Sequence, residues 1–282
     1  MSFNAATRLL AVFTALLALG ACSAKAQPTV VAHAGETAQP SPGTTTPTQP
    51  PPTASPTPSA PPEPKSLEWY VAKAPTFQAT PPPRPVKLSA NGSAPFWLRV
   101  PTQDKVAFIT IDDGALARPA EVPDFIRDAH IPVTMFLNSP AATEHTDYFK
   151  RIEAAGGVVE NHTIHHTSLK GRSYAYQKQE ICGSADKLEQ LFGKRPTLFR
   201  PPFGDHDATT MRAAHECGAK ALFYWTETVD KGIVRYQTPE KRVQPGDVLL
   251  MHFRPRLMDD LLAALKAIQQ AGLTPALLED YV

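Results

Sequence analysis

Short apolar runs alternate with longer amphipathic stretches from about residue 86 to the end of the chain. The runs at 105–111 and 131–137 are mostly apolar and rich in β-branched residues, which predicts buried strands. Shorter runs of the same kind predict strands at 157–160, 197–199, 219–225 and 247–251. Apolar residues at helical spacing predict helices at 146–155, 174–192, 207–217 and 259–270. Strands that alternate with helices in this way predict an α/β domain with a parallel sheet or barrel.

The N-terminus has the pattern of a bacterial export signal. Residues 9–19 form an apolar run that is shorter than the roughly 18–20 residues a membrane-spanning helix needs. Leu19-Gly20-Ala21-Cys22 follows and resembles a lipobox, so we expect a lipoprotein signal peptide at 1–21 and lipidation of Cys22. An ordinary secretory signal with an incidental cysteine is the alternative. The lipoprotein interpretation predicts an extracytoplasmic protein, anchored through Cys22 to the cell membrane of a bacterium.

Proline is concentrated between this signal and the predicted domain. Of the 30 prolines, 17 lie at 28–85, and the stretch 38–64 is rich in Pro, Thr and Ser with Glu63 as its one charged residue. Such a composition cannot bury a core and stays extended and solvated. We therefore expect a lipidated, disordered linker at 22–85, which either spaces a catalytic domain at 86–282 from the membrane or is passive.

Charge and cysteine content narrow the class of protein further. The formal net charge of +1 argues against a nucleic-acid binder.

Outside the cytoplasm, Cys182 and Cys217 could form a disulfide or remain two buried free thiols, and the sequence leaves both open. No oligomer interface is apparent in the pattern, so we expect a monomer.

Ionisable side chains follow several of the predicted strands at the point where each ends. Because the carboxyl ends of parallel strands meet at one rim, these side chains should converge there. They are Asp112, Asp113, His162, His166, Arg200 and His252.

Two histidines and one carboxylate have the composition of a hydrolytic metal site. His162 and His166 are four residues apart, so on a helical turn both imidazoles would point the same way. With Asp113 they would make a three-ligand site that leaves a position open, as hydrolytic zinc requires. Taken alone, the pair could equally be two surface histidines, and Asp-Asp-Gly could be a simple tight turn.

The other polar residues suggest acid–base chemistry beside that metal. Asp112 is free to act as a general base towards a water activated by the metal. Arg200 lies in a Pro-rich loop and could hold a carboxylate in a bidentate manner. His252 ends an apolar strand and could be a general acid, or else a satisfied core histidine.

Together these motifs resemble the polysaccharide deacetylase family, also described as the NodB-homology domain of carbohydrate esterase family 4. The resemblance covers about residues 100–282 in the family's motif order. The segments that carry the resemblance are 110–114 (TIDDG), 161–166 (NHTIHH), 200–204 (RPPFG) and 250–252 (LMH). The family fold is a deformed (β/α) barrel, so we expect that fold here.

The resemblance also implies roles for individual residues. Asp113, His162 and His166 would hold a divalent metal, most simply Zn²⁺, with Co²⁺, Mn²⁺ or Fe²⁺ as alternatives. Asp112 would be the catalytic base, oriented by Arg200, and His252 the acid. A backbone N–H near Phe203 would stabilise an oxyanion, and Leu250 would line the slot for the acetyl methyl group.

The chain departs from the family at its fourth motif, typically Asp-x-x-Asp-Trp. The corresponding stretch is 225–231 (WTETVDK), which has no following tryptophan. Only Asp230 or Glu227 could be the carboxylate that tunes the acid histidine. Trp225 could form a wall of the pocket or pack in the core.

These features predict a metal-dependent hydrolase that removes N-acetyl groups from an extracellular amino-sugar polymer, such as peptidoglycan or a chitin-like glycan. One alternative is an O-acetyl esterase acting on xylan or another acetylated glycan. Another is a non-catalytic cell-wall-binding module. An iron oxygenase shares the ligand types, but it would give no role to Asp112 and His252.

Overall fold

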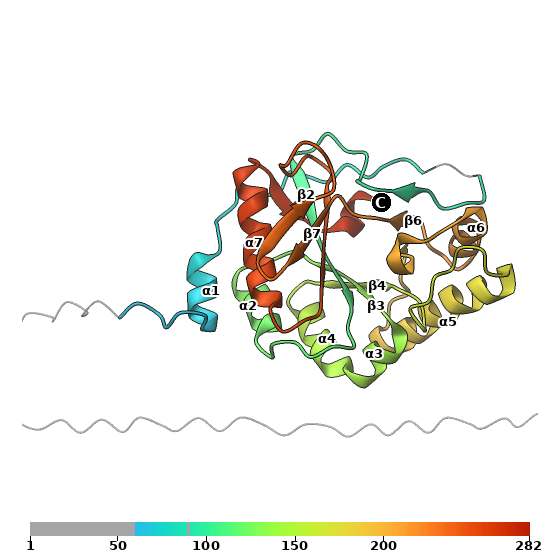
Figure 1. Ribbon diagram of the computed structural model, residues 1–282, viewed down its shortest axis with the longest axis horizontal. Coiled ribbons are helices and arrows are strands. Elements are labelled where there is room, and N and C mark those ends of the chain that lie inside the picture. Colours follow the sequence, from blue (N-terminus) through green and yellow to red (C-terminus); the bar gives the residue numbers. More distant parts are fainter. Residues whose placement is uncertain (1–59, 89–90) are drawn as a thin grey trace, which may run out of the picture. The chain divides into compact units, whose positions relative to one another are not determined.

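The computed structural model describes residues 60–88 and 91–282 (Figure 1). The predicted signal peptide, the lipidation site at Cys22 and most of the predicted linker lie outside the described residues. Among the described helices, none combines the length and apolarity needed to cross a membrane.

The folded part begins earlier than the predicted boundary at residue 86. Helix α1 (Leu67–Lys73) is capped by Ser66, whose side chain accepts a hydrogen bond from the backbone of Trp69. Tyr70 is buried, and its hydroxyl donates to Asp259 over 2.7 Å. The helix packs against α2 and α7, so the end of the segment expected to be linker belongs to the domain.

A single ten-stranded sheet forms the centre of the fold. The strands lie in the order β1-β6-β5-β4-β3-β2-β9-β7-β8, and β10 pairs with β2. All pairings between these strands are parallel except the β7–β8 hairpin. The strands are β1 (Phe96–Trp97), β2 (Val106–Asp113), β3 (Thr134–Leu137), β4 (Val158–Asn161), β5 (Leu198–Phe199), β6 (Ala221–Phe223), β7 (Glu227–Asp230), β8 (Ile233–Tyr236), β9 (Val248–His252) and β10 (Thr274–Ala276).

Helices surround the curled sheet (Figure 1). Besides α1 they are α2 (Val122–Asp128), α3 (Ser139–Glu144), α4 (Thr146–Ala154), α5 (Tyr174–Phe192), α6 (Ala208–Glu216) and α7 (Leu257–Gln270). Within residues 60–88 and 91–282 there are also two short 3-10 turns, η1 (Pro202–Gly204) and η2 (Leu278–Tyr281). This arrangement confirms the predicted deformed (β/α) barrel.

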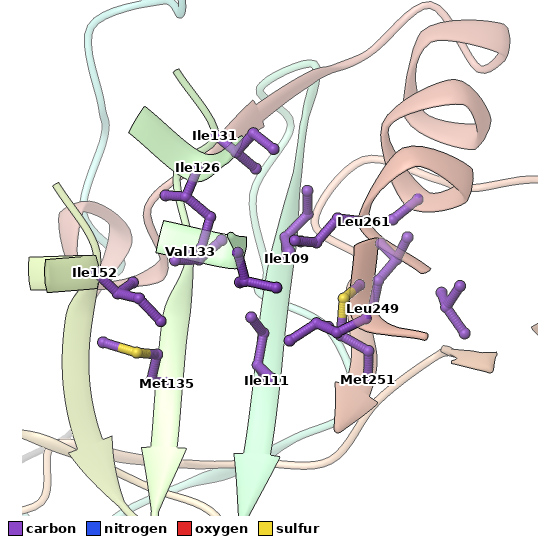
Figure 2. Packing of buried hydrophobic residues seen from close by; sticks show 14 of the residues in the cluster. Ile109, Ile111, Ile126, Ile131, Val133, Met135, Ile152, Leu249, Met251 and Leu261 are labelled. Carbon is purple, nitrogen blue, oxygen red and sulfur yellow. The ribbon is translucent and has the colours of Figure 1, made fainter. Parts of the chain in front are cut away.

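The two faces of β2 pack into different parts of the core. Ile109 and Ile111 face the helices and pack with residues of β3, β9 and α7 (Figure 2). Phe108 belongs to the cluster inside the curled sheet, with Phe136 and Val248. Because strand side chains alternate, Thr110 and Asp112 continue the inner row, and Asp112 reaches its carboxyl end. Burial on both faces explains why this strand is nearly continuously apolar.

Cys182 and Cys217 form a disulfide with a Cα–Cα distance of 4.9 Å. It joins the middle of α5 to the residue that follows α6. The structure therefore decides between the two alternatives that the sequence left open, in favour of the disulfide.

Candidate active site and metal centre

Three side chains converge into a potential metal site at the carboxyl ends of β2 and β4. The Asp113 Oδ1 lies 3.4 Å from His166 Nε2 and 3.7 Å from His162 Nε2. One ligand atom from each residue lies within 4.8 Å of the others. Asp113 Oδ1 is buried, and none of the described residues gives it a hydrogen bond, which is costly unless a cation neutralises it. Two imidazoles and a carboxylate with such an unsatisfied oxygen fit a zinc-type ion.

The histidines meet for a different reason from the predicted helical spacing. Residues 162–166 form an irregular turn, not a helix. Thr163 and His166 adopt positive φ angles of 74° and 52°. These left-handed residues turn the chain sharply, so that the rings of His162 and His166 lie 4.9 Å apart. The expectation of a helical turn was wrong, although the convergence it predicted is present.

His162 is prepared to act as a neutral metal ligand. Its Nδ1 lies 2.7 Å from the carbonyl oxygen of Arg200, which can only accept, so Nδ1 carries the proton. Nε2 is then free to face the other two ligands. Burial lowers the pKa of His162 against the opposing influence of Asp112 and Asp113, and this favours the neutral form that binds metals.

Asp112 and Arg200 form a buried ion pair beside the triad. Arg200 Nη1 donates to Asp112 Oδ1 over 2.6 Å and to Thr110 Oγ1 over 2.9 Å, and Nη2 donates to the carbonyl of Tyr224 over 3.0 Å. The guanidinium also stacks over the ring of Phe136 at 4.3 Å. These contacts fix one oxygen of Asp112. The other, Oδ2, lies 3.7 Å from His162 Nε2 and so faces the candidate metal site.

His252 and Leu250 line the same side of the sheet. Asp112 pairs with His252 and Thr110 with Leu250 across the β2–β9 register. Because alternate residues share a face, Leu250 and His252 lie on the inner side with Asp112. His252 is partly exposed and Leu250 is buried. This arrangement suits an accessible acid above an apolar floor.

Phe203 stands at the mouth of the site. Its side chain is 61% exposed, and its ring lies 4.8 Å from the ring of His166. Its backbone has a φ of 60°, and Gly204 follows with a φ of 71°. A Cβ on Gly204 would lie 1.9 Å from the ring of Tyr224, so only glycine fits there. The loop after Arg200 is thus shaped by close packing on Tyr224.

The altered fourth motif takes a different arrangement from the one that the resemblance implies. Asp230 lies 3.5 Å from Arg254, and within the described residues no hydrogen bond or ion pair joins it to His252. Glu227 is buried, and burial together with Asp247 raises its pKa to about 8. Trp225 is half-buried and stacks on Tyr224 with ring centroids 3.9 Å apart.

Several residues that hold the site in place were not identified from the sequence. Thr110 and Tyr224 hold Arg200, and Asn138 holds the backbone of His162. Glu180 contacts His165. A charged residue next to the apolar stripe of the predicted helix 174–192 was the one signal that could have indicated Glu180.

Comparison with known proteins agrees with this geometry. The family model described as polysaccharide deacetylase matches residues 99–222. An uncharacterised protein of Streptomyces coelicolor is 40% identical over 65% of this chain and 75% of its own length. A peptidoglycan-N-acetylglucosamine deacetylase of Bacillus cereus is 28% identical over 52% of this chain and 55% of that protein. A bifunctional xylanase/xylan deacetylase of Cellvibrio japonicus is 27% identical over 51% of this chain and 22% of that protein.

Solved structures show the same fold. A family 4 carbohydrate esterase pseudoenzyme from Bacillus anthracis has a TM-score of 0.57 at 18% identity, covering 67% of this chain and 69% of its own. The peptidoglycan N-acetylglucosamine deacetylase Bc1960 also has a TM-score of 0.57, at 20% identity over 66% of this chain and 92% of its own. The family match, the 40% identical relative and the shared fold agree with the motif order, and the chain belongs to the polysaccharide deacetylase family.

Proposed function

We propose that the protein is a metal-dependent deacetylase that removes N-acetyl groups from an extracellular amino-sugar polymer. The observation that carries this proposal is the convergence of Asp112, Asp113, His162 and His166 at one rim, with Arg200 fixing the first of them. A site for binding alone would need no buried carboxylate held beside the ligands by a guanidinium.

Asp113, His162 and His166 would hold the ion. A divalent cation there would supply Lewis-acid activation of both a water molecule and the acyl carbonyl group. Asp112 Oδ2 would accept the proton of the attacking water, since Oδ1 is already bound to Arg200. The backbone N–H of Phe203 would donate to the developing oxyanion. His252 would then protonate the leaving nitrogen, releasing acetate and a free amine.

The names of relatives and the predicted location support a choice of substrate class. Relatives carry the names peptidoglycan-N-acetylglucosamine deacetylase and peptidoglycan-N-acetylmuramic acid deacetylase. For a lipoprotein carried on a Pro-rich spacer, peptidoglycan would be the nearest acetylated amino-sugar polymer. We therefore favour peptidoglycan, with the membrane anchor at Cys22 as part of the same proposal.

Two further functions are supported by specific observations. The relative named xylan deacetylase favours an O-acetyl esterase with the same residues and a different leaving group. The pseudoenzyme with the same fold, together with the pairing of Asp230 with Arg254, favours a module that has lost turnover. These functions differ in the polymers from which the purified chain would release acetate.

The test measures acetate release by the purified chain from acetylated chitooligosaccharides, peptidoglycan and acetylated xylan. Each reaction is run after chelation of metals and again after zinc is restored. Zinc-dependent release from the N-acetyl substrates supports the proposal, and release from xylan alone would replace it with the esterase. Zinc binding without acetate release from any polymer would favour the binding module.

A further inference from the structure

The turn that carries both metal-binding histidines has a strained backbone. Thr163 and His166 have positive φ angles of 74° and 52°, and neither is a glycine. Residues held in such conformations carry a free-energy cost and persist only where the surrounding structure enforces them. The contacts that enforce this turn therefore determine where the ligand nitrogens point.

Helix α5 supplies several of these contacts. Ser184 Oγ donates to the carbonyl oxygen of Thr163 over 3.0 Å. At Gly183, an added Cβ would lie 3.0 Å from the Cδ1 of Ile164, so the helix approaches the turn closely there. Glu180 lies one helical turn before Ser184, and its side chain faces the same way. The turn thus rests on one face of α5.

Glu180 binds the turn through both of its carboxylate oxygens. Its Oε2 accepts from the backbone N–H of His165 over 2.9 Å, and its Oε1 lies 2.6 Å from the ring Nδ1 of the same residue. A carboxylate oxygen can only accept here, so the ring nitrogen donates. Glu180 is 2% exposed, whereas the side chain of His165 is 64% exposed.

This difference in burial indicates what the contact does. Burying a carboxylate is unfavourable unless strong hydrogen bonds offset the loss of water. The exposed imidazole of His165 adds little to the core, so holding this ring is not needed to fill space. What the two bonds do fix is the backbone and the ring of the residue that immediately precedes His166.

Building on the proposed metal-dependent function, we propose that Glu180 is a positioning residue for the metal centre. By clamping His165, it holds the turn 162–166 so that His162 and His166 present their Nε2 atoms to the site before an ion binds. The carboxylate does not touch the ion and acts only through His165. Residues that orient metal ligands in this way typically change metal affinity about 10- to 100-fold.

The test compares zinc affinity, measured by competition with a chromogenic chelator, for the full chain and four variants. Glu180→Ala should weaken zinc binding about 10- to 100-fold. Glu180→Gln keeps one oxygen for the backbone N–H and should lose less. Glu189→Gln is the matched control, because Glu189 lies on the same helix in an exposed ion pair with Arg195. The zinc affinity of this variant should equal the wild-type value.

His165→Ala keeps the test decisive if Glu180→Ala does not fold. It removes only the bond from the exposed ring, and a roughly 3- to 10-fold loss of zinc affinity is expected. With Co²⁺ bound in place of zinc, Glu180→Ala and His165→Ala should also alter the visible absorption spectrum, which reports ligand geometry. Unchanged zinc affinity in both variants would overturn the proposal, even if their thermal stability fell. Absence of zinc binding by the wild-type chain would instead overturn the metal-dependent function itself.

Discussion

At the scale of single residues, the carboxylate of Asp112 pairs with the fully buried guanidinium of Arg200. Arg200 is held by Thr110 Oγ1, the Tyr224 carbonyl and the Phe136 ring as well as by Asp112. The position of Asp112 Oδ1 is therefore set by a rigid partner. Only Oδ2 is left to take a proton, and it faces the ligand set 3.7 Å from His162 Nε2.

Replacing Asp112 with asparagine should separate proton transfer from metal binding. The amide oxygen can still accept from Arg200, but an amide cannot take a proton from water at neutral pH. We expect acetate release to fall about 10²- to 10⁴-fold while zinc affinity stays within a few-fold of wild type. Asp128→Asn, at an exposed residue paired with Arg127, is the control and should retain full activity. Full activity in Asp112→Asn would exclude this residue as the base.

The residues of the candidate metal site were more predictable than the residues that support them. Asp113, His162 and His166 could be predicted because their residue types and positions at strand ends match a metal site. The role of Glu180 could not, since a charged residue beside an apolar stripe does not name its partner, and His165 is placed by a turn whose positive φ angles leave no sequence signature. The contact of Asp230 with Arg254 depends on how the β7–β8 hairpin packs, which periodicity does not indicate.

At the scale of elements, the pattern predicted the strands and helices that carry a clear apolar signal and missed the others. Strands β2 to β6 and β9 and helices α4 to α7 lie where the pattern predicts them. Strand β1 has two residues and β10 three, and neither stood out as an apolar run. In the β7–β8 hairpin, β7 alternates buried and half-buried residues and β8 alternates exposed and half-buried ones, so neither is a continuous apolar run. Helices α2 and α3 are too short for a clear period.

The disulfide between α5 and α6 links two elements by a loop of 35 residues. Closing such a loop restricts the unfolded chain and stabilises the native state by about 3–4 kcal/mol on chain-entropy grounds. We expect the double variant Cys182→Ser, Cys217→Ser to lose free energy of unfolding of that order in urea titrations. Wild-type protein under reducing conditions should behave like the variant. Equal stability of oxidised and reduced protein would contradict this.

The junction of β7 and β9 should make stability depend on pH. Burial and Asp247 raise the pKa of Glu227 to about 8 from its ordinary value of 4.5. The folded state therefore holds a proton that the unfolded state releases, so stability is greatest below about pH 4.5 for this group and is lost as pH rises towards 8. The expected loss is on the order of 2 kcal/mol or more.

Glu227→Gln tests this contribution directly, because glutamine stays neutral throughout. Urea unfolding at pH 5 and pH 8 should show a smaller decrease for Glu227→Gln than for wild type, with the variant more stable at pH 8. Glu144→Gln, at a side chain that is 75% exposed, should follow the wild-type curve. Parallel curves for all three proteins would show that Glu227 does not titrate in this range.

At the scale of the whole molecule, the segment before the barrel is part of its stability. Tyr70 is buried within the main hydrophobic cluster, and Leu67 and Trp69 pack against that cluster. The hydroxyl of Tyr70 also binds Asp259 at the start of α7. Composition placed this helix in the linker because prolines surround it on both sides. Local apolar content, rather than overall proline density, decides where the fold begins.

A chain that starts at residue 86 should therefore be less stable than one that starts at residue 60. Removing a large buried aromatic side chain alone costs about 3–5 kcal/mol, so we expect a decrease of at least about 2 kcal/mol in urea unfolding. Helix α1 gives no side chain to the candidate metal site or to the Asp112–Arg200 pair, so kcat should change less than about twofold. Tyr70→Phe, which keeps the ring and loses only its bond to Asp259, should cost about 1 kcal/mol. If the two chains unfold at the same urea concentration, α1 rests on the barrel without stabilising it, and the domain begins at residue 86 after all.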